Sequence, residues 1–167
     1  SSSKPLKASS ARLPPAMEDA KKMDAAVRSW VEICGCMGNA FEARARMKAV
    51  DDESVRPFLL TRRPGTIQIH ASAWRLFLRY ADEEGLCAED LDEPMAYQYL
   101  RALASRNAPP SRARSFLKGC HFAFGLFAFL RGHCIASSAR CMGAAASSHA
   151  RHGVRRQRDP LTMEQLR

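Results

Sequence analysis

A strip of basic side chains lies in the first half of one predicted helix. Arg114, Lys118 and His121 recur at helical spacing within RARSFLKGCHFAFGLFAFLR, residues 112–131, so they fall on one face. In the second half of the segment the same side is apolar. A helix that is apolar all round at one end must be buried there, whereas basic side chains at its other end must meet water or an anion. The expected chemistry is the binding of anionic groups at the start of this helix.

Acidic and basic residues are separated along the chain. The 167 residues carry a formal net charge of +9, and seven of the 17 acids lie within residues 82–93. Residues 94–158 contain no Asp or Glu but 11 Lys or Arg. Because ordinary solvated surfaces mix both signs, this stretch favours a polyanionic partner, most simply nucleic acid. A composition biased towards Ala and Arg is the alternative explanation.

The sequence offers no pattern typical of a catalytic or cofactor site. It contains no phosphate-binding loop, and no nucleophile and base are recognisably paired. Its six cysteines lack the paired spacing of zinc sites, and nothing else in the chain indicates secretion, so we expect reduced thiols, with Cys87 and Cys120 filling space. We therefore expect no metal, no cofactor and no small-molecule substrate.

Membrane insertion is not expected either. The apolar part of the phenylalanine-rich segment, residues 119–130, is shorter than the ~20 residues that a membrane-spanning helix needs. No secretory signal is recognisable. An intracellular protein is expected, although the basic, Ser-rich leader of residues 1–16 is also compatible with an organelle-targeting peptide.

Helical periodicity predicts an all-α fold, a small bundle of crossed helix pairs. Expected helices span residues 17–37, 40–50, 66–84, 93–105, 112–131 and 137–146. Thr66, Asp92 and Ser111 are the expected N-caps. The helix over 66–84 has apolar stripes on two sides and is expected to pack centrally, against the phenylalanine-rich helix.

The same patterns predict how the chain is divided. The expected parts are a disordered leader (1–16), an N-terminal helical appendage (17–50), a Pro-containing connector (51–64), a helical domain (65–146), a basic linker (147–158) and the start of a truncated following domain (159–167). Residues 65–167 are expected to fold without the appendage. The chain does not begin with Met, which favours a fragment or a processed product.

Short motifs in the second part of the chain follow one another in a familiar order. They are Thr66 with Trp74 and Phe77, the pair Tyr99-Leu100, the helix entry Pro110-Ser111-Arg112, and, after the basic linker, Pro160-Leu161-Thr162-Met163-Glu164-Gln165-Leu166 with its Glu one place early. In this order they resemble the core-binding, SAM-like domain of tyrosine recombinases and phage-type integrases, up to the start of the catalytic domain. The resemblance covers residues 65–167.

This resemblance implies a helical clamp that grips one side of duplex DNA, with two helix starts facing the major groove. The DNA-binding residues that it implies at these helix starts are Thr66, Gln68, Ile69, Arg112, Arg114, Ser115 and Lys118. Arg155 and Arg156 of the basic linker are expected to bind DNA as well. The catalytic groups of the family lie beyond the last motif, so Tyr80, Tyr97 and Tyr99 are not expected to be nucleophiles, and this chain is not expected to be an enzyme by itself.

The expected function is thus that of a DNA-binding module of a site-specific recombinase or integrase, acting in DNA recombination and integration. Double-stranded DNA is the expected partner. Further copies of the recombinase bound to the same DNA are a second partner that the sequence leaves open. The expected location is on DNA, which in a eukaryotic host means the nucleus. The alternative is a helical protein–protein interaction domain without nucleic-acid binding. In that case the acidic cluster (residues 82–93) and the helix over 17–37 would be docking surfaces.

Overall fold

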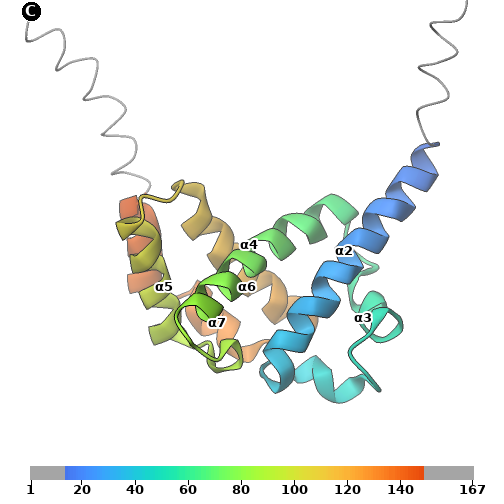
Figure 1. Ribbon diagram of the computed structural model, residues 1–167, viewed down its shortest axis with the longest axis horizontal. Coiled ribbons are helices and arrows are strands. Elements are labelled where there is room, and N and C mark those ends of the chain that lie inside the picture. Colours follow the sequence, from blue (N-terminus) through green and yellow to red (C-terminus); the bar gives the residue numbers. More distant parts are fainter. Residues whose placement is uncertain (1–13, 149–167) are drawn as a thin grey trace, which may run out of the picture.

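The computed structural model describes residues 14–148, and every regular element in that range is helical (Figure 1). In chain order the elements are α2 (Pro15–Met37), the 3-10 helices η1 (Gly38–Ala40) and η2 (Glu42–Arg46), α3 (Asp52–Leu59), α4 (Pro64–Glu83), the 3-10 helix η3 (Ala88–Asp90), α5 (Glu93–Ser105), α6 (Ser111–Phe127) and α7 (Leu130–Ala136). Residues 139–148 form a further helical segment. The predicted all-α fold is confirmed. The basic linker beyond residue 148 and the final motif lie outside the described residues.

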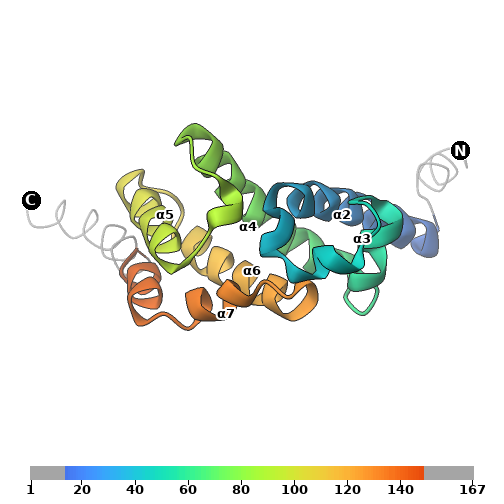
Figure 2. The same ribbon diagram turned by 90° about the horizontal axis from the view of Figure 1, so that it is seen from below.

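α4 and α6 cross at the centre of the molecule (Figures 1 and 2). Trp74 of α4 is fully buried, and its indole Nε1 donates a hydrogen bond to the carbonyl oxygen of Gly119 in α6 over 2.9 Å. A Cβ atom at Gly119 would come within 3.3 Å of the Trp74 ring, so a glycine here permits the close crossing. The expected pairing of these two helices is confirmed.

α2 belongs to the same core. Its Trp30 is fully buried, stacks on Phe127 of α6 with ring centroids 5.2 Å apart, and donates from Nε1 to the carbonyl oxygen of Ile67 in α4 over 3.0 Å. α2 packs more extensively on α4 than on any other element. The residues on the two sides of the predicted boundary at residue 65 therefore pack into one core. In the first half of α2 every residue except Met23 is exposed, and this half projects from the body at the upper right of Figure 1.

The phenylalanine-rich segment is not one helix. α6 ends at Phe127, Ala128 adopts a left-handed conformation (φ 53°), and α7 follows at Leu130. A left-handed Ala costs about 1–2 kcal/mol. The turn places Phe129 in the core, fully buried, with its ring centroid 5.5 Å from those of both Trp74 and Phe41. Burial of this ring explains why the chain turns where local propensity favours a continued helix.

The region between α2 and α4 differs from the prediction. A helix was expected over 40–50, but two short 3-10 helices and a turn occur there, and Phe41 and Met47 reach the core. The expected connector contains α3, whose start is capped by Asp51, which accepts a hydrogen bond from the Ser54 amide over 2.9 Å. Pro57 is tolerated inside α3 on its exposed side.

Two of the three predicted N-caps are wrong. α4 begins at Pro64 with Arg63 as its N-cap, so Thr66 is its third residue, and Ser111 is the first residue of α6 rather than its cap. Proline, with its fixed φ, starts α4 at the position where a missing N–H costs least. Asp92 does cap α5, since its side chain accepts from the Met95 amide over 3.0 Å.

The cysteines are all free. Cys120 is buried in α6, as expected, and Cys34 and Cys141 are buried as well. Cys87, predicted to fill space, is exposed instead, because it lies in the turn after α4 rather than under it.

Candidate nucleic-acid interface

The predicted DNA-binding residues of the described range lie at the starts of α4 and α6. Thr66, Ile69, Arg112, Arg114 and Lys118 are exposed, and Gln68 and Ser115 are half-buried. Ile69 is the most exposed large apolar side chain of the described residues, at 64%. Arg155 and Arg156 lie outside the described residues.

A groove along α6 brings basic side chains from three segments together. Arg114, Lys118 and His121 of α6 line it with His70 of α4 and Arg62 of the preceding turn. Its floor is apolar and comes from Leu117, Phe122, Gly125, Ala136 and Met142. We call this feature the α6 groove. No carboxylate is among the described residues that line it, so it is a cationic site.

The other predicted residues do not share this groove. Gln68 and Ile69 lie in a second groove between α2 and α4, which Lys22, Arg28 and Arg75 also line. Arg112 lies in a third hollow, beside Arg79 and Arg106. Arg112 and Arg114 are separated because two residues along a helix correspond to a rotation of about 200°. The structure thus places five of the predicted residues on three different surfaces, whereas Thr66 and Ser115 line none of the three.

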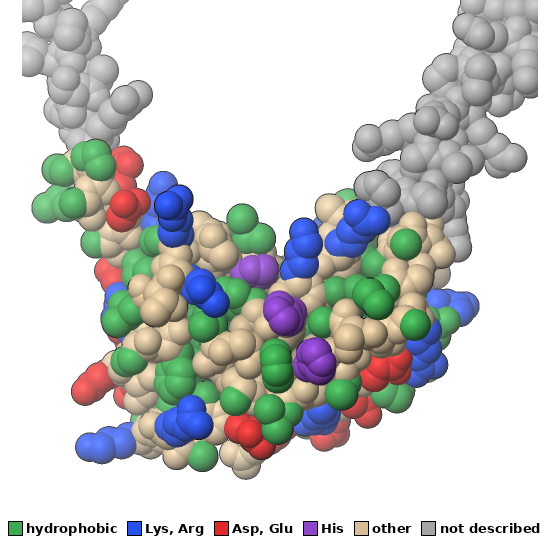
Figure 3. Space-filling model, turned by 180° about the vertical axis from the view of Figure 1, so that it is seen from behind, with side chains coloured by type: hydrophobic (Ala, Val, Ile, Leu, Met, Phe, Trp, Pro, Cys, Tyr) green, Lys and Arg blue, Asp and Glu red, His purple; other side chains and the backbone are tan. Residues whose placement is uncertain are grey.

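Ion pairing distinguishes the α6 groove from the second groove and the third hollow, each of which includes one arginine that is held in an ion pair. Arg56 pairs with Asp24 and Asp52, Arg75 with Glu32, Arg106 with Glu83 and Glu84, and Arg140 with Glu93. Arg62, Arg114 and Lys118 have no carboxylate partner within the described part of the chain. On the face shown in Figure 3, histidine side chains lie across the middle, with Lys and Arg around them and acidic side chains towards the edges. The cations of the groove are available to an external anion.

His70 is the half-buried member of the groove. Its ring stacks on Phe122 with centroids 4.3 Å apart and an interplanar angle of 27°. Burial, and secondarily the positive charge of Lys118, lower the pKa of His70 below its usual 6.5. An anion bound between these two side chains would offset the repulsion and favour the protonated imidazole.

The acidic cluster of residues 82–93 is largely engaged within the fold. Glu83 and Glu84 pair with Arg106, and a Glu89 carboxylate oxygen accepts from the Asn39 amide over 3.0 Å. Asp92 caps α5, and Glu93 binds Arg140. These carboxylates hold helix ends and turns in place rather than forming a free acidic surface.

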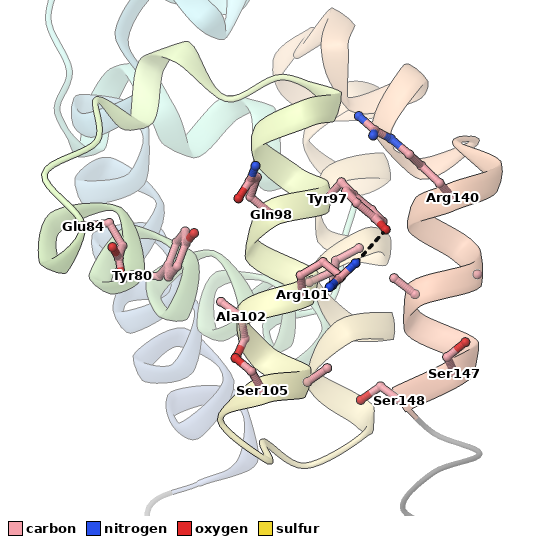
Figure 4. A pocket seen from close by; sticks show the side chains of 14 residues that line it. Tyr80, Glu84, Tyr97, Gln98, Arg101, Ala102, Ser105, Arg140, Ser147 and Ser148 are labelled. Atoms are coloured by element: carbon pink, nitrogen blue, oxygen red, sulfur yellow. Dashed lines mark hydrogen bonds between the residues drawn. The ribbon is translucent and has the colours of Figure 1, made fainter.

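A larger hollow, of about 780 Å³, lies between α5 and the helical segment 139–148 (Figure 4). Arg101 donates to the Tyr97 hydroxyl over 3.3 Å, and the Arg140 guanidinium lies 4.4 Å from the centre of the Tyr97 ring. Glu84 also lines the hollow. With mixed charges and its cations already in contact with other groups, this hollow is a weaker candidate for a polyanion than the α6 groove.

Sequence reasoning placed Arg114, Lys118 and His121 on one strip but missed Arg62 and His70. Arg62 lies in the segment 51–64, which the sequence predicts to be a connector. His70 could have been recognised, since it follows Thr66 by four residues and therefore lies on the same side of α4. Arg62 has no comparable sequence signal, because its position depends on how the turn before α4 folds.

Comparison with known proteins adds no further assignment. No protein-family model matches the chain, and neither a curated protein nor a solved structure matches it. Among residues 14–148, no helix is both long and apolar enough to cross a membrane, and no three potential metal ligands cluster together.

Proposed function

We propose that the chain is a DNA-binding module, the non-catalytic N-terminal part of a site-specific recombinase or integrase of the tyrosine type. One observation carries the DNA-binding part of this proposal: Arg62, Arg114 and Lys118 converge on one groove without carboxylate partners in the described range. Arg and Lys side chains that neutralise phosphates release counterions and supply most of the sequence-independent affinity for DNA. The recombinase assignment rests on the sequence resemblance.

Two further features support the proposal over the protein-interaction alternative. The apolar stripe of α2 is buried in the core from Ala26 to Met37, so this part of the helix is not free to dock a partner. The carboxylates of the acidic cluster are mostly engaged in internal contacts. The part of α2 that packs on α4 and most carboxylates of the acidic cluster are therefore already engaged within the fold.

A non-catalytic role agrees with the state of the tyrosines. Tyr80 and Tyr99 are buried, and burial raises the pKa of Tyr99 to about 12. Tyr97 is half-buried and covered by the Arg140 guanidinium. None of the three is an exposed, activated hydroxyl of the kind that a phosphoryl-transfer nucleophile requires.

The test is a titration of a labelled mixed-sequence duplex, followed by fluorescence anisotropy at several salt concentrations. For the native chain, log affinity should fall linearly with log salt. Arg114→Ala/Lys118→Ala should weaken binding and reduce this slope by ~0.9 for each phosphate that the variant no longer neutralises. The smaller slope is diagnostic, since a general loss of folded protein would lower affinity without changing it.

Arg46→Ala/Lys48→Ala is the matched control. It removes the same charge from exposed positions in and after η2. η2 lies at the other end of α6, where the Glu42 amide donates to the Ala128 carbonyl over 3.2 Å. Equal affinities and slopes for the two variants would rule out the α6 groove as the DNA contact. Absence of duplex binding at low salt, combined with salt-insensitive self-association, would favour the protein-interaction alternative.

A further inference from the structure

The α6 groove has a shape that duplex binding alone does not explain. It follows α6 from Arg114 to Gly125, a distance of about 16 Å at 1.5 Å per residue. Arg62 and His70 line it from α4 and the turn before α4. Ala136 lines it from the end of α7, and Met142 from the helical segment 139–148. Its rim is cationic, whereas its floor is apolar.

An apolar floor has little to contact on a duplex. The outside of a double helix presents phosphates and sugars, and its bases remain stacked with only their edges accessible. Such a ligand would engage Arg62, Arg114 and Lys118 but would leave the 48% exposed Met142 in water. The floor instead fits a ligand that carries flat apolar groups between its negative charges.

Three histidines contact phenylalanine rings in and beside the groove, and one of these pairs is stacked. His70 lies on Phe122 with centroids 4.3 Å apart. Next to them, Phe124 lies between His121 and His133, at 6.1 and 5.2 Å. His121 and His133 are exposed and His70 is half-buried, so these imidazoles are accessible to an external ligand. Unpaired bases stack on aromatic rings of this kind, including histidine.

We propose that the α6 groove binds an unpaired stretch of a nucleic-acid strand. Its phosphates contact Arg62, Arg114 and Lys118, and its bases stack on His70 and His121 above the apolar floor. At 3.4 Å per stacked nucleotide, the groove accommodates about four or five nucleotides. This inference rests on nucleic acid being the partner, as in the proposed function, and adds that the partner includes a single-stranded segment.

An acidic amphipathic helix is the competing occupant. It would match a basic rim and an apolar floor of this length by charge and shape. The accessible imidazole rings favour nucleotides, because a flat base covers a ring face more completely than an aliphatic side chain does. A helical peptide with Leu on one face and Glu on the other therefore serves as the contrasting probe.

The test compares three labelled nucleic acids of equal length: an oligothymidine strand, an abasic strand with the same phosphates but no bases, and a duplex. We expect the thymidine strand to bind at least about fivefold more tightly than the abasic strand, which is the smallest effect of one stacked base. His121→Ala, at an exposed position, should reduce this ratio without changing the salt slope. Gln98→Ala, exposed on α5 outside the groove, is the control and should leave the ratio unchanged.

The outcomes separate this inference from the proposed function. Equal binding of thymidine and abasic strands, with the duplex still bound, overturns the single-strand inference alone. Failure of all three probes to bind overturns both. Competition by the Leu/Glu peptide, with no preference for thymidine over abasic strands, assigns the groove to a protein partner and also overturns the inference.

Discussion

Gly132 lies where α7 crosses the backbone of α6. A Cβ atom there would be 2.5 Å from the Cys120 carbonyl oxygen and 2.8 Å from the Phe129 ring. The first of these atoms is backbone, so a clash can be relieved only by moving a helix. We expect Gly132→Ala to destabilise the fold by about 1–3 kcal/mol or more, measured by urea denaturation. Gly125→Ala is the control. No neighbouring atom lies within 4 Å of its added Cβ, and it should be neutral or stabilise α6 by up to ~1 kcal/mol.

His70 should make stability depend on pH in a defined direction. Its pKa is lowered in the folded state, so the unfolded chain binds the proton more tightly. The folded protein should therefore lose stability as pH falls through about 6.5 and below. Lys118, which lowers this pKa, lines the same groove as Arg62, Arg114 and His121, so all the charged groups of the groove disfavour a further proton.

The His70 titration can be followed directly by NMR of its imidazole protons. Lys118→Ala should move the pKa of His70 upwards, towards its usual value, because one source of repulsion is removed. Addition of duplex should move it in the same direction. A His70 titration that neither change affects would mean that the groove cations and the histidine do not interact. The control is Lys48→Ala, an exposed change outside the α6 groove.

At the scale of single elements, one acidic side chain of α5, Glu93, anchors the start of the helical segment 139–148. Glu93 accepts from Arg140 Nε over 2.8 Å and from the Ser138 hydroxyl over 2.5 Å. The Ser138 oxygen in turn accepts from the Cys141 amide and so caps this segment. The Arg140 hydrogen bond, followed by that from Ser138, lowers the pKa of Glu93 to about 2. The attachment should therefore persist in mild acid and weaken only as pH falls from about 4.5 towards 2.

Glu93→Gln should loosen this segment while leaving the core folded. We expect amide hydrogen exchange across residues 139–148 to become faster, with little change in α4 and α6, because local openings are governed by local contacts. Asp90→Asn is the comparison, because Asp90 belongs to the same acidic cluster but is exposed, and its carboxylate accepts no hydrogen bond from residues 14–148. Exchange that accelerates equally in both variants would show that net charge, rather than this contact, controls the segment.

Elements with long, regular apolar periodicity were predictable from the sequence. α2, α4 and α5 begin and end within two residues of their expected positions, since each combines a clear stripe with a proline, a cap or a glycine at an end. The break at Ala128 was not predictable. Alanine favours helix, and the benefit of turning there is the burial of Phe129 against side chains far away in sequence.

The candidate site shows the same division between local and non-local information. Arg114 and Lys118 share a face because of helical periodicity, which the sequence contains. Their meeting with Arg62 and His70 depends on how α4 crosses α6, and that crossing is set by Trp74 and Gly119. Residue spacing within α6 therefore predicts the part of the site that α6 contributes, but not the residues that α4 and the turn before it add.

At the scale of the whole molecule, one aromatic cluster joins the two parts that the sequence predicted to be separate. Trp30 of α2 has its ring 5.2 Å from Phe127, 5.4 Å from Phe122 and 6.4 Å from Trp74. Phe41 adds a stacked contact to Phe127 at 5.5 Å. Removal of residues 1–61 would therefore expose the centre of the core rather than uncover a finished surface.

A chain that begins at Arg62 should not fold cooperatively. The removal of one large buried aromatic side chain costs about 3–5 kcal/mol, and at least two are absent here, against a total stability of about 5–15 kcal/mol for such a protein. Circular dichroism should record reduced helicity and a broad melt. In the full chain, Trp30→Ala should cost about 3–5 kcal/mol, whereas Met17→Ala, on the projecting half of α2 and 58% exposed, should stay within ~0.5 kcal/mol. A sharp, native-like melting transition of the shortened chain would instead mean that α4 to α7 close their own core, with α2 as a removable layer.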